Sequence, residues 1–185
     1  RWTAADPSIR WFHQNARGLD VTIEDISEQT AALALQGPTS GGLLMKAAEA
    51  DVENLKYFRV TSGTIAGVPV DISRTGYTGD LGYEVWMPWD KAVTVWDALV
   101  KAGEAFDVHA AGMLALDVAR IEAGLLLIDV DFNNAKRAQI EAQKYTPYEM
   151  GLGRLVSKDK ARFVGQAALA DERRRGHARA SVGLA

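Results

Sequence analysis

The 185-residue chain is 48% hydrophobic, which is enough for one domain with a buried core, or for a domain plus an extension. A formal charge of −3 gives no basic face for nucleic acid, and the lack of cysteine excludes disulfides, thiolate metal sites and cysteine catalysis. No apolar run reaches the roughly 18 residues of a membrane span and no signal peptide is recognisable, so we expect a soluble cytoplasmic protein without a membrane partner.

Apolar periodicity and turn signals predict two helices and five strands in the first half of the chain. In chain order these are helix 6–16, strands 21–27 and 31–37, helix 39–50, and strands 57–62, 68–74 and 82–87. Asp6 and Pro7 suit the start of the first helix, and Thr39 or Ser40 suits the cap of the second.

The second half is richer in helices. It predicts helix 88–106, a helix over 110–124 that ends at Gly124, an extended apolar stretch over 125–132, a final helix after a turn at Gly165, and a strand cut short over 180–185. Trp89, Val93 and Trp96 share one helical stripe, so we expect them to be buried against the sheet. The basic run over 171–179 is typical of a solvated helix end.

The mixture of strands and helices has no regular βαβ alternation. It therefore predicts an α+β fold, with a mostly antiparallel sheet and packed helices. Common catalytic patterns are weak: the three histidines lack metal-ligand spacing, so no metal site is expected. The glycine-rich stretches over 37–42 and 75–82 match neither the P-loop nor the dinucleotide fingerprint.

Glu84 is the remaining candidate for a binding residue. Tyr83, Val85 and Met87 share one face of the strand predicted over 82–87, while Glu84 lies with Trp86 on the other face. A carboxylate beside an indole can hold a flat, nitrogen-rich ring through two parallel N–H···O bonds, as a pterin would offer. The alternative is a solvent-facing glutamate on an ordinary sheet.

The stretch SRTGYTGDLGYEVWMP, over residues 73–88, closely resembles the signature of the aminomethyltransferase family, which includes the T-protein of the glycine cleavage system. Further resemblances follow in the family's order and together span about residues 20–170: DISEQTAALALQGPTS, LALDVARIEAGLLL, TPYEMGLGRLV and RFVGQAAL.

The resemblance implies a tetrahydrofolate-binding domain that is partial in residues 1–185, lacking an N-terminal part and the C-terminal β-barrel of full-length relatives. In T-proteins an aminomethyl group on a lipoyl arm is released as ammonia, and its one-carbon unit passes to tetrahydrofolate. Glu84 falls on the family glutamate that grips the pterin. The other folate-binding residues that the resemblance implies are Tyr77, Gly79, Gly82, Tyr83 and Arg120, with the glycines allowing close backbone approach and the tyrosines lining or bracing the site.

Three departures from the family pattern concern the chemistry. The family's catalytic aspartate is expected upstream of residue 1, so the catalytic residue is unknown. Leu116 stands where T-proteins carry an arginine, and LIDVD over 127–131 replaces a stretch like LYGND. The last two favour a relative with a different methyl or aminomethyl donor.

Three functions stay open on the sequence alone. The first is a tetrahydrofolate-dependent aminomethyl or methyl transferase, or a fragment of one. The second is the folate domain of a demethylase or of an enzyme that oxidises dimethylglycine or sarcosine, and the third is a non-catalytic folate-binding protein. The expected partners are folate, a lipoyl carrier protein, and either the missing part of the domain or a second copy of the chain.

Overall fold

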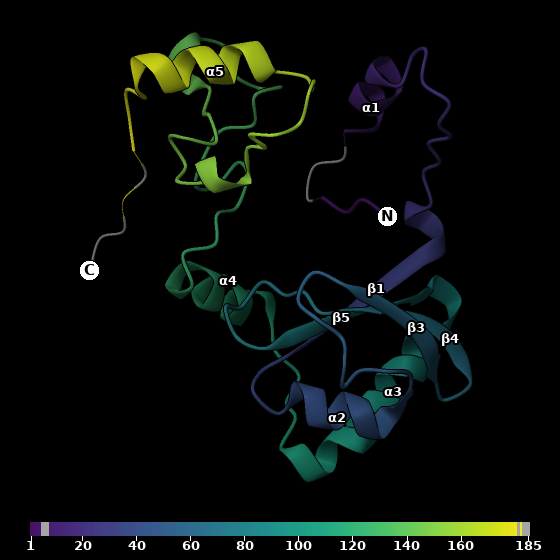
Figure 1. Ribbon diagram of the computed structural model, residues 1–185. Coiled ribbons are helices and arrows are strands. Elements are labelled where there is room, and N and C mark those ends of the chain that lie inside the picture. Colours follow the sequence, from purple (N-terminus) through teal and green to yellow (C-terminus); the bar gives the residue numbers. More distant parts are fainter. Residues whose placement is uncertain (5–7, 181, 183–185) are drawn as a thin grey trace. The chain divides into compact units, whose positions relative to one another are not determined.

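The computed structural model describes residues 1–4, 8–180 and 182. The chain divides into two compact units, unit 1 (Arg1–Leu125) and unit 2 (Leu126–Ala185). Unit 1 contains a five-stranded sheet of order β1-β5-β4-β3-β2, in which each pairing is antiparallel (Figure 1). The predicted α+β fold with an antiparallel sheet is thereby confirmed.

The strands are β1 (Thr30–Gln36), β2 (Ala48–Glu49), β3 (Val60–Ile65), β4 (Val68–Ser73) and β5 (Gly82–Pro88). The α-helices are α1 (Ile9–Asn15), α2 (Ser40–Ala47), α3 (Ala92–Gly103), α4 (Met113–Glu122) and, in unit 2, α5 (Gln166–Arg175). Short 3-10 turns cover Ser27–Gln29, Trp89–Lys91, Glu104–Phe106, Glu141–Gln143 and Gly153–Leu155.

The strand predicted over 21–27 is wrong. Residues 21–26 form no strand, and a 3-10 turn begins at Ser27. The Asp25 carboxylate accepts hydrogen bonds from both the backbone N–H (3.0 Å) and the hydroxyl (2.6 Å) of Ser27. This local side-chain turn competes with sheet pairing, and alternating hydrophobicity alone does not reveal it.

The other predicted elements of unit 1 are present with shifted ends, but the capping interpretation needs correction. Thr39 occupies the cap position of α2 without a side-chain cap bond, and the Ser40 hydroxyl donates to the Leu81 carbonyl (3.3 Å). Asp6 and Pro7 lie outside the described residues, as does most of the strand predicted over 180–185.

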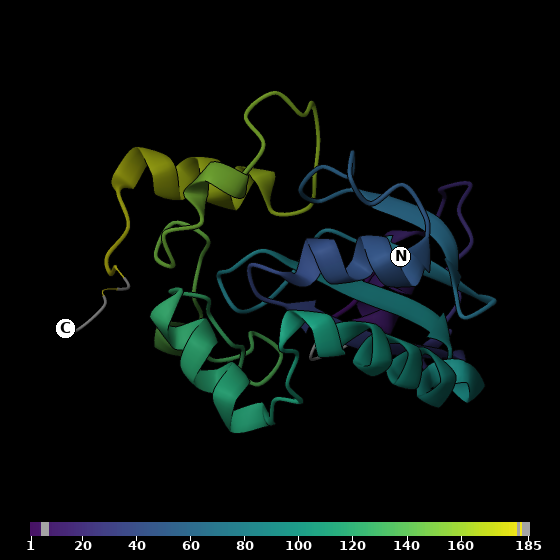
Figure 2. The same ribbon diagram turned by 90° about the horizontal axis from the view of Figure 1, so that it is seen from below.

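The alternation predicted for β5 is confirmed. Tyr83, Val85 and Met87 are buried beneath the sheet, and Glu84 and Trp86 lie on the opposite face. The buried face packs on α2 and α3, which lie side by side against it (Figures 1 and 2). Neither of these helices packs on the other face of the sheet, which carries Glu84.

The face of α3 that packs on the sheet differs from the prediction. Trp89, Val93 and Trp96 are 65%, 73% and 44% exposed, whereas Val95 and Leu99 are buried. The buried stripe is completed by the small residues Ala92, Ala98 and Ala102. Small side chains let the helix approach the sheet closely, and the apolar pattern alone did not separate this face from the bulkier one beside it.

Unit 2 consists mainly of turns around α5. Its buried carboxylate, Glu149, pairs with Arg179 through two contacts of 3.0 Å. The hydrogen bonds from Arg179 hold the pKa of Glu149 below its usual value. Gly165 has a positive φ of 87° at the predicted turn before α5, and the exposed arginines after Asp171 confirm a solvated helix end. No helix among the described residues is both long and apolar enough to cross a bilayer.

Candidate functional site

The glycine-rich bend between β4 and β5 is built around the side chain of Gln36. The Gln36 amide donates to the backbone oxygens of Tyr83 (3.1 Å) and Thr75 (3.4 Å). A Cβ at Gly76 or at Gly82 would overlap this amide. The two glycines therefore make room for a side chain from β1, which supports the bend on the face of the sheet that carries Glu84.

Gly79 lies at the tip of the same bend, with a positive φ of 80°. A Cβ there would overlap the Cβ of Ala123, which caps the C-terminal end of α4. The bend and this end of α4 therefore touch. Protein atoms fill the space beside Gly79 and Gly82, so their expected role in bringing backbone close to folate stays a prediction.

Glu84 is half-buried and held from one side. Its Oε2 atom accepts the hydroxyl of Thr75 (2.5 Å), with the Ser73 hydroxyl farther away (3.5 Å). Its Oε1 atom accepts no hydrogen bond from the described residues. Each carboxylate oxygen can accept two hydrogen bonds, so this arrangement orients the group and leaves Oε1 and the second acceptor position of Oε2 for a ligand.

The surroundings of Glu84 form a flat platform. The cross-strand partners of Glu84 are Ala34 on β1 and Ser73 on β4, and Ala32 lies opposite Trp86. Ala32 and Ala34 are exposed and small, so no side chain from β1 covers the carboxylate. A planar ring can therefore lie on this face beside the Trp86 indole.

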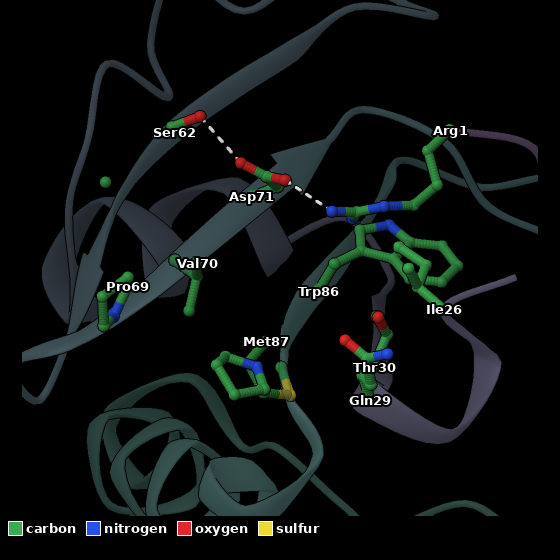
Figure 3. Close-up of a pocket in the computed structure, with 12 residues that line it drawn as sticks. Arg1, Ile26, Gln29, Thr30, Ser62, Pro69, Val70, Asp71, Trp86 and Met87 are labelled. Atoms are coloured by element: carbon green, nitrogen blue, oxygen red, sulfur yellow. Dashed lines mark hydrogen bonds and ion pairs between the residues drawn. The ribbon is translucent and has the colours of Figure 1, made fainter. Parts of the chain in front are cut away.

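A pocket of about 330 Å³ opens on the far side of Trp86, where β4 and β5 separate (Figure 3). Strand pairing between them covers only Asp71–Ser73 and Glu84–Trp86, and a proline at position 69 supplies no N–H to extend it. Arg1 crosses the pocket, bonding to Asp71 (2.7 Å) with its guanidinium 5.4 Å from the centre of the Trp86 ring.

The remaining predicted site residues are spread over several elements. Tyr83 points into the core on the face opposite Glu84, with its hydroxyl near Gly41, so of the two roles expected for it only bracing fits. Tyr77 is half-buried on the bend. Arg120 is buried in α4, bonded to Asp117 (3.0 Å) and to the Leu125 carbonyl (3.3 Å).

Three neighbours of Glu84 were not predicted from the sequence. Thr75 donates to its carboxylate, Ser73 lies 2.7 Å from the Thr75 hydroxyl, and Gln36 supports the bend that carries Thr75. Both hydroxyl residues lie in the stretch that drew attention to Glu84, but only the fold shows that they turn toward it. No group of three or more metal-ligating acids and histidines occurs within the described part of the chain.

Comparisons with known proteins show the family to which the chain belongs. The family model for the GCVT N-terminal domain matches residues 2–160. The aminomethyltransferase of Halothermothrix orenii is 39% identical over 97% of this chain and 47% of its own length. The aminomethyltransferase of Streptomyces coelicolor is 40% identical over 90% of this chain and 42% of its own length.

The chain thus spans about half the length of these curated relatives. Among solved structures, the glycine cleavage system aminomethyltransferase T from Bartonella henselae superposes with a TM-score of 0.49 at 19% identity, covering 82% of this chain and 63% of its own. From the family match over residues 2–160, the chain belongs to the GCVT N-terminal domain family.

Proposed function

We propose that this chain binds tetrahydrofolate for the transfer of an aminomethyl or methyl one-carbon unit. The observation that carries the proposal is the Glu84 carboxylate. It lies on the sheet face that α2 and α3 leave open, with Oε2 held by Thr75 and with Oε1 free of bonds from the described residues. Three similar curated proteins named aminomethyltransferase support the same function.

The residues present fit a pterin. A pterin offers a ring N–H and a 2-amino group side by side, which match the two oxygens of one carboxylate. Ala32 and Ala34 leave the space that a flat ring needs, and Trp86 offers an aromatic wall next to Glu84. When bound, tetrahydrofolate supplies the nitrogen that receives the one-carbon unit, and Glu84 fixes the orientation of its ring.

The proposal includes the chemical group that donates the one-carbon unit. Kinship with aminomethyltransferases supports a lipoyl-bound aminomethyl group as one candidate donor, with its carrier protein as the partner. Leu116 is half-buried on α4, where it supplies no charge. This favours a donor that does not need a cationic contact there. We place the reaction in the cytoplasm.

Glu84→Gln is expected to weaken tetrahydrofolate binding about tenfold or more, because a charge-assisted pair is worth roughly 1.5–3 kcal/mol. The glutamine keeps the shape of the side chain but replaces one acceptor oxygen with an amide that clashes with the ligand's N–H donors. Titration calorimetry of both proteins with tetrahydrofolate measures the ratio of dissociation constants.

Glu49→Gln is the matched control, since Glu49 is an exposed strand glutamate that also accepts a threonine hydroxyl, from Thr64 at 3.1 Å. Its dissociation constant should equal that of the wild type, and both variants should melt near the wild-type temperature. Equal affinity of Glu84→Gln and the wild type would remove Glu84 from the folate site.

We also propose that a second copy of the chain pairs with β1. The described part of the sheet ends at this strand, whose seven residues include no charge and no proline. Antiparallel pairing centred on Leu33 would place Thr30 opposite Gln36 and Ala31 opposite Leu35, and so keep apolar side chains on the core face. Uncharged edges of this kind associate readily.

Light scattering on the 185-residue chain is therefore expected to give a mass above that of one copy. Ala32→Lys, which places a charge on the exposed face of the edge strand, should return the mass to that of a monomer. A wild-type chain that stays monomeric at high concentration would rule out pairing through β1.

A further inference from the structure

The geometry points to Thr75 as a positioning residue that orients the Glu84 carboxylate as an acceptor, and so makes the site selective for rings that present adjacent N–H donors. The inference rests on the proposed function, since it concerns how the same carboxylate recognises its ligand. It starts from a chain of hydrogen bonds that joins four side chains of β4, the bend and β5: Trp86, Ser73, Thr75 and Glu84.

The protons in this chain of hydrogen bonds can be assigned from the distances. Thr75 has one hydroxyl proton, and its shortest contact is with Glu84 Oε2 at 2.5 Å. In this contact the Thr75 hydroxyl donates and the carboxylate oxygen accepts. The Ser73 hydroxyl lies 2.7 Å from Thr75 Oγ1, and since the Thr75 proton is already used, Ser73 is the donor in this second contact.

Trp86 closes the chain of hydrogen bonds at its other end. Its indole Nε1, which can only donate, lies 3.4 Å from Ser73 Oγ. The hydrogen bonds therefore run in one direction, from the Trp86 N–H through the Ser73 and Thr75 hydroxyls to the Glu84 carboxylate. Chains with a single direction strengthen one another, and here every donor points toward the carboxylate.

The backbone of Thr75 is itself held by Gln36, which lies on the same face of the sheet as Glu84. The Thr75 backbone oxygen accepts the Gln36 amide at 3.4 Å, and the same amide binds the backbone oxygen of Tyr83 beside Glu84. The amide thus ties together the backbone on both sides of the carboxylate. Thr75 can therefore set the rotamer of Glu84 without touching the ligand.

The consequence is a rule for the ligand. With Oε2 engaged and oriented, the carboxylate presents further acceptor positions toward the open face and has no proton to donate. A ring with an N–H next to an amino group is bound, and a ring with a methyl group or an acceptor in place of the amino group is rejected.

Two ligands and three variants test this rule. The ligands are tetrahydrofolate and its analogue with a 2-methyl group in place of the 2-amino group. Thr75→Val removes the hydroxyl at nearly constant shape, Thr75→Ser restores a hydroxyl, and Thr64→Val removes the matched hydroxyl that donates to Glu49. Titration calorimetry gives the ratio of the two dissociation constants for each protein.

The wild type should prefer tetrahydrofolate about tenfold, and Thr75→Val should weaken tetrahydrofolate binding roughly fivefold while lowering that preference to about twofold. Thr75→Ser should restore most of both values, and Thr64→Val should change neither. If Thr75 had a purely structural role, Thr75→Val would lower the melting temperature and leave the preference for tetrahydrofolate over its 2-methyl analogue unchanged.

The outcomes separate this inference from the proposed function. If Glu84→Gln loses affinity but Thr75→Val keeps the wild-type preference, the positioning role is wrong and folate binding stands. If wild type and Glu84→Gln bind tetrahydrofolate equally, the folate assignment itself fails. Loss of affinity in Thr75→Val without rescue by Thr75→Ser also overturns the positioning role.

Discussion

Leu99→Ala is expected to lower the free energy of unfolding by about 2–5 kcal/mol, the cost of removing a large buried side chain that leaves a cavity. Leu99 is only 6% exposed and belongs to the core cluster beneath the sheet, together with Val95 and Val85. Urea denaturation followed by circular dichroism measures the change, with the slope of the transition kept as a check on two-state behaviour.

Trp96→Ala on the same helix is the control. Tryptophan is the larger side chain, yet Trp96 is 44% exposed, so its loss should cost less than about 1 kcal/mol. Whichever variant loses more free energy of unfolding identifies the face of α3 that packs on the sheet. A larger cost for Trp96→Ala than for Leu99→Ala would mean that the apolar stripe with Trp89 and Val93 is the buried one.

Gly63→Ala should cost about 1–3 kcal/mol, because there is no room for a methyl group at this point of the sheet. A Cβ on Gly63 would overlap the backbone oxygen of Glu49 and the Cβ of Ala50, at the end of β2. Backbone cannot move aside as a flexible side chain can, so β2 would have to shift away from β3. Thermal unfolding should show a lower melting temperature.

Gly112→Ala provides the comparison for that substitution. Gly112 has a negative φ of −85°, and a Cβ there would meet no atom within 4 Å. Its effect on stability should stay within about 0.5 kcal/mol. Equal melting temperatures for Gly63→Ala and the wild type would show that the strands around Gly63 are farther apart than described here.

The sequence pattern predicted the structure correctly where neighbouring residues of a single helix or strand determine it. The alternation across β5 correctly separated buried Tyr83 and Val85 from Glu84, since successive strand residues face opposite sides of a sheet. The turn between β3 and β4 lies in the gap between the strands predicted over 57–62 and 68–74, although β3 extends to Ile65, and φ is positive at both Ala66 (50°) and Gly67 (75°).

The sequence pattern did not predict the structure where residues far apart in the sequence are in contact. Gln36 supports a bend about forty positions later in the chain, and nothing in a stretch of glycines tells which side chain will fill the space they leave. Helix α3 has two apolar stripes that could pack on the sheet, and the one with small residues is buried because it allows closer packing. Near Ser27, a single aspartate carboxylate replaced strand pairing with a turn.

The structure of the complex with tetrahydrofolate tests the central claim most directly. We expect the pterin on the open sheet face beside Trp86, with its ring N–H and 2-amino nitrogen each about 2.7–2.9 Å from a Glu84 oxygen. Thr75 should keep its bond to Oε2 in that complex. A pterin bound elsewhere, with Glu84 touching none of its atoms, would contradict the account.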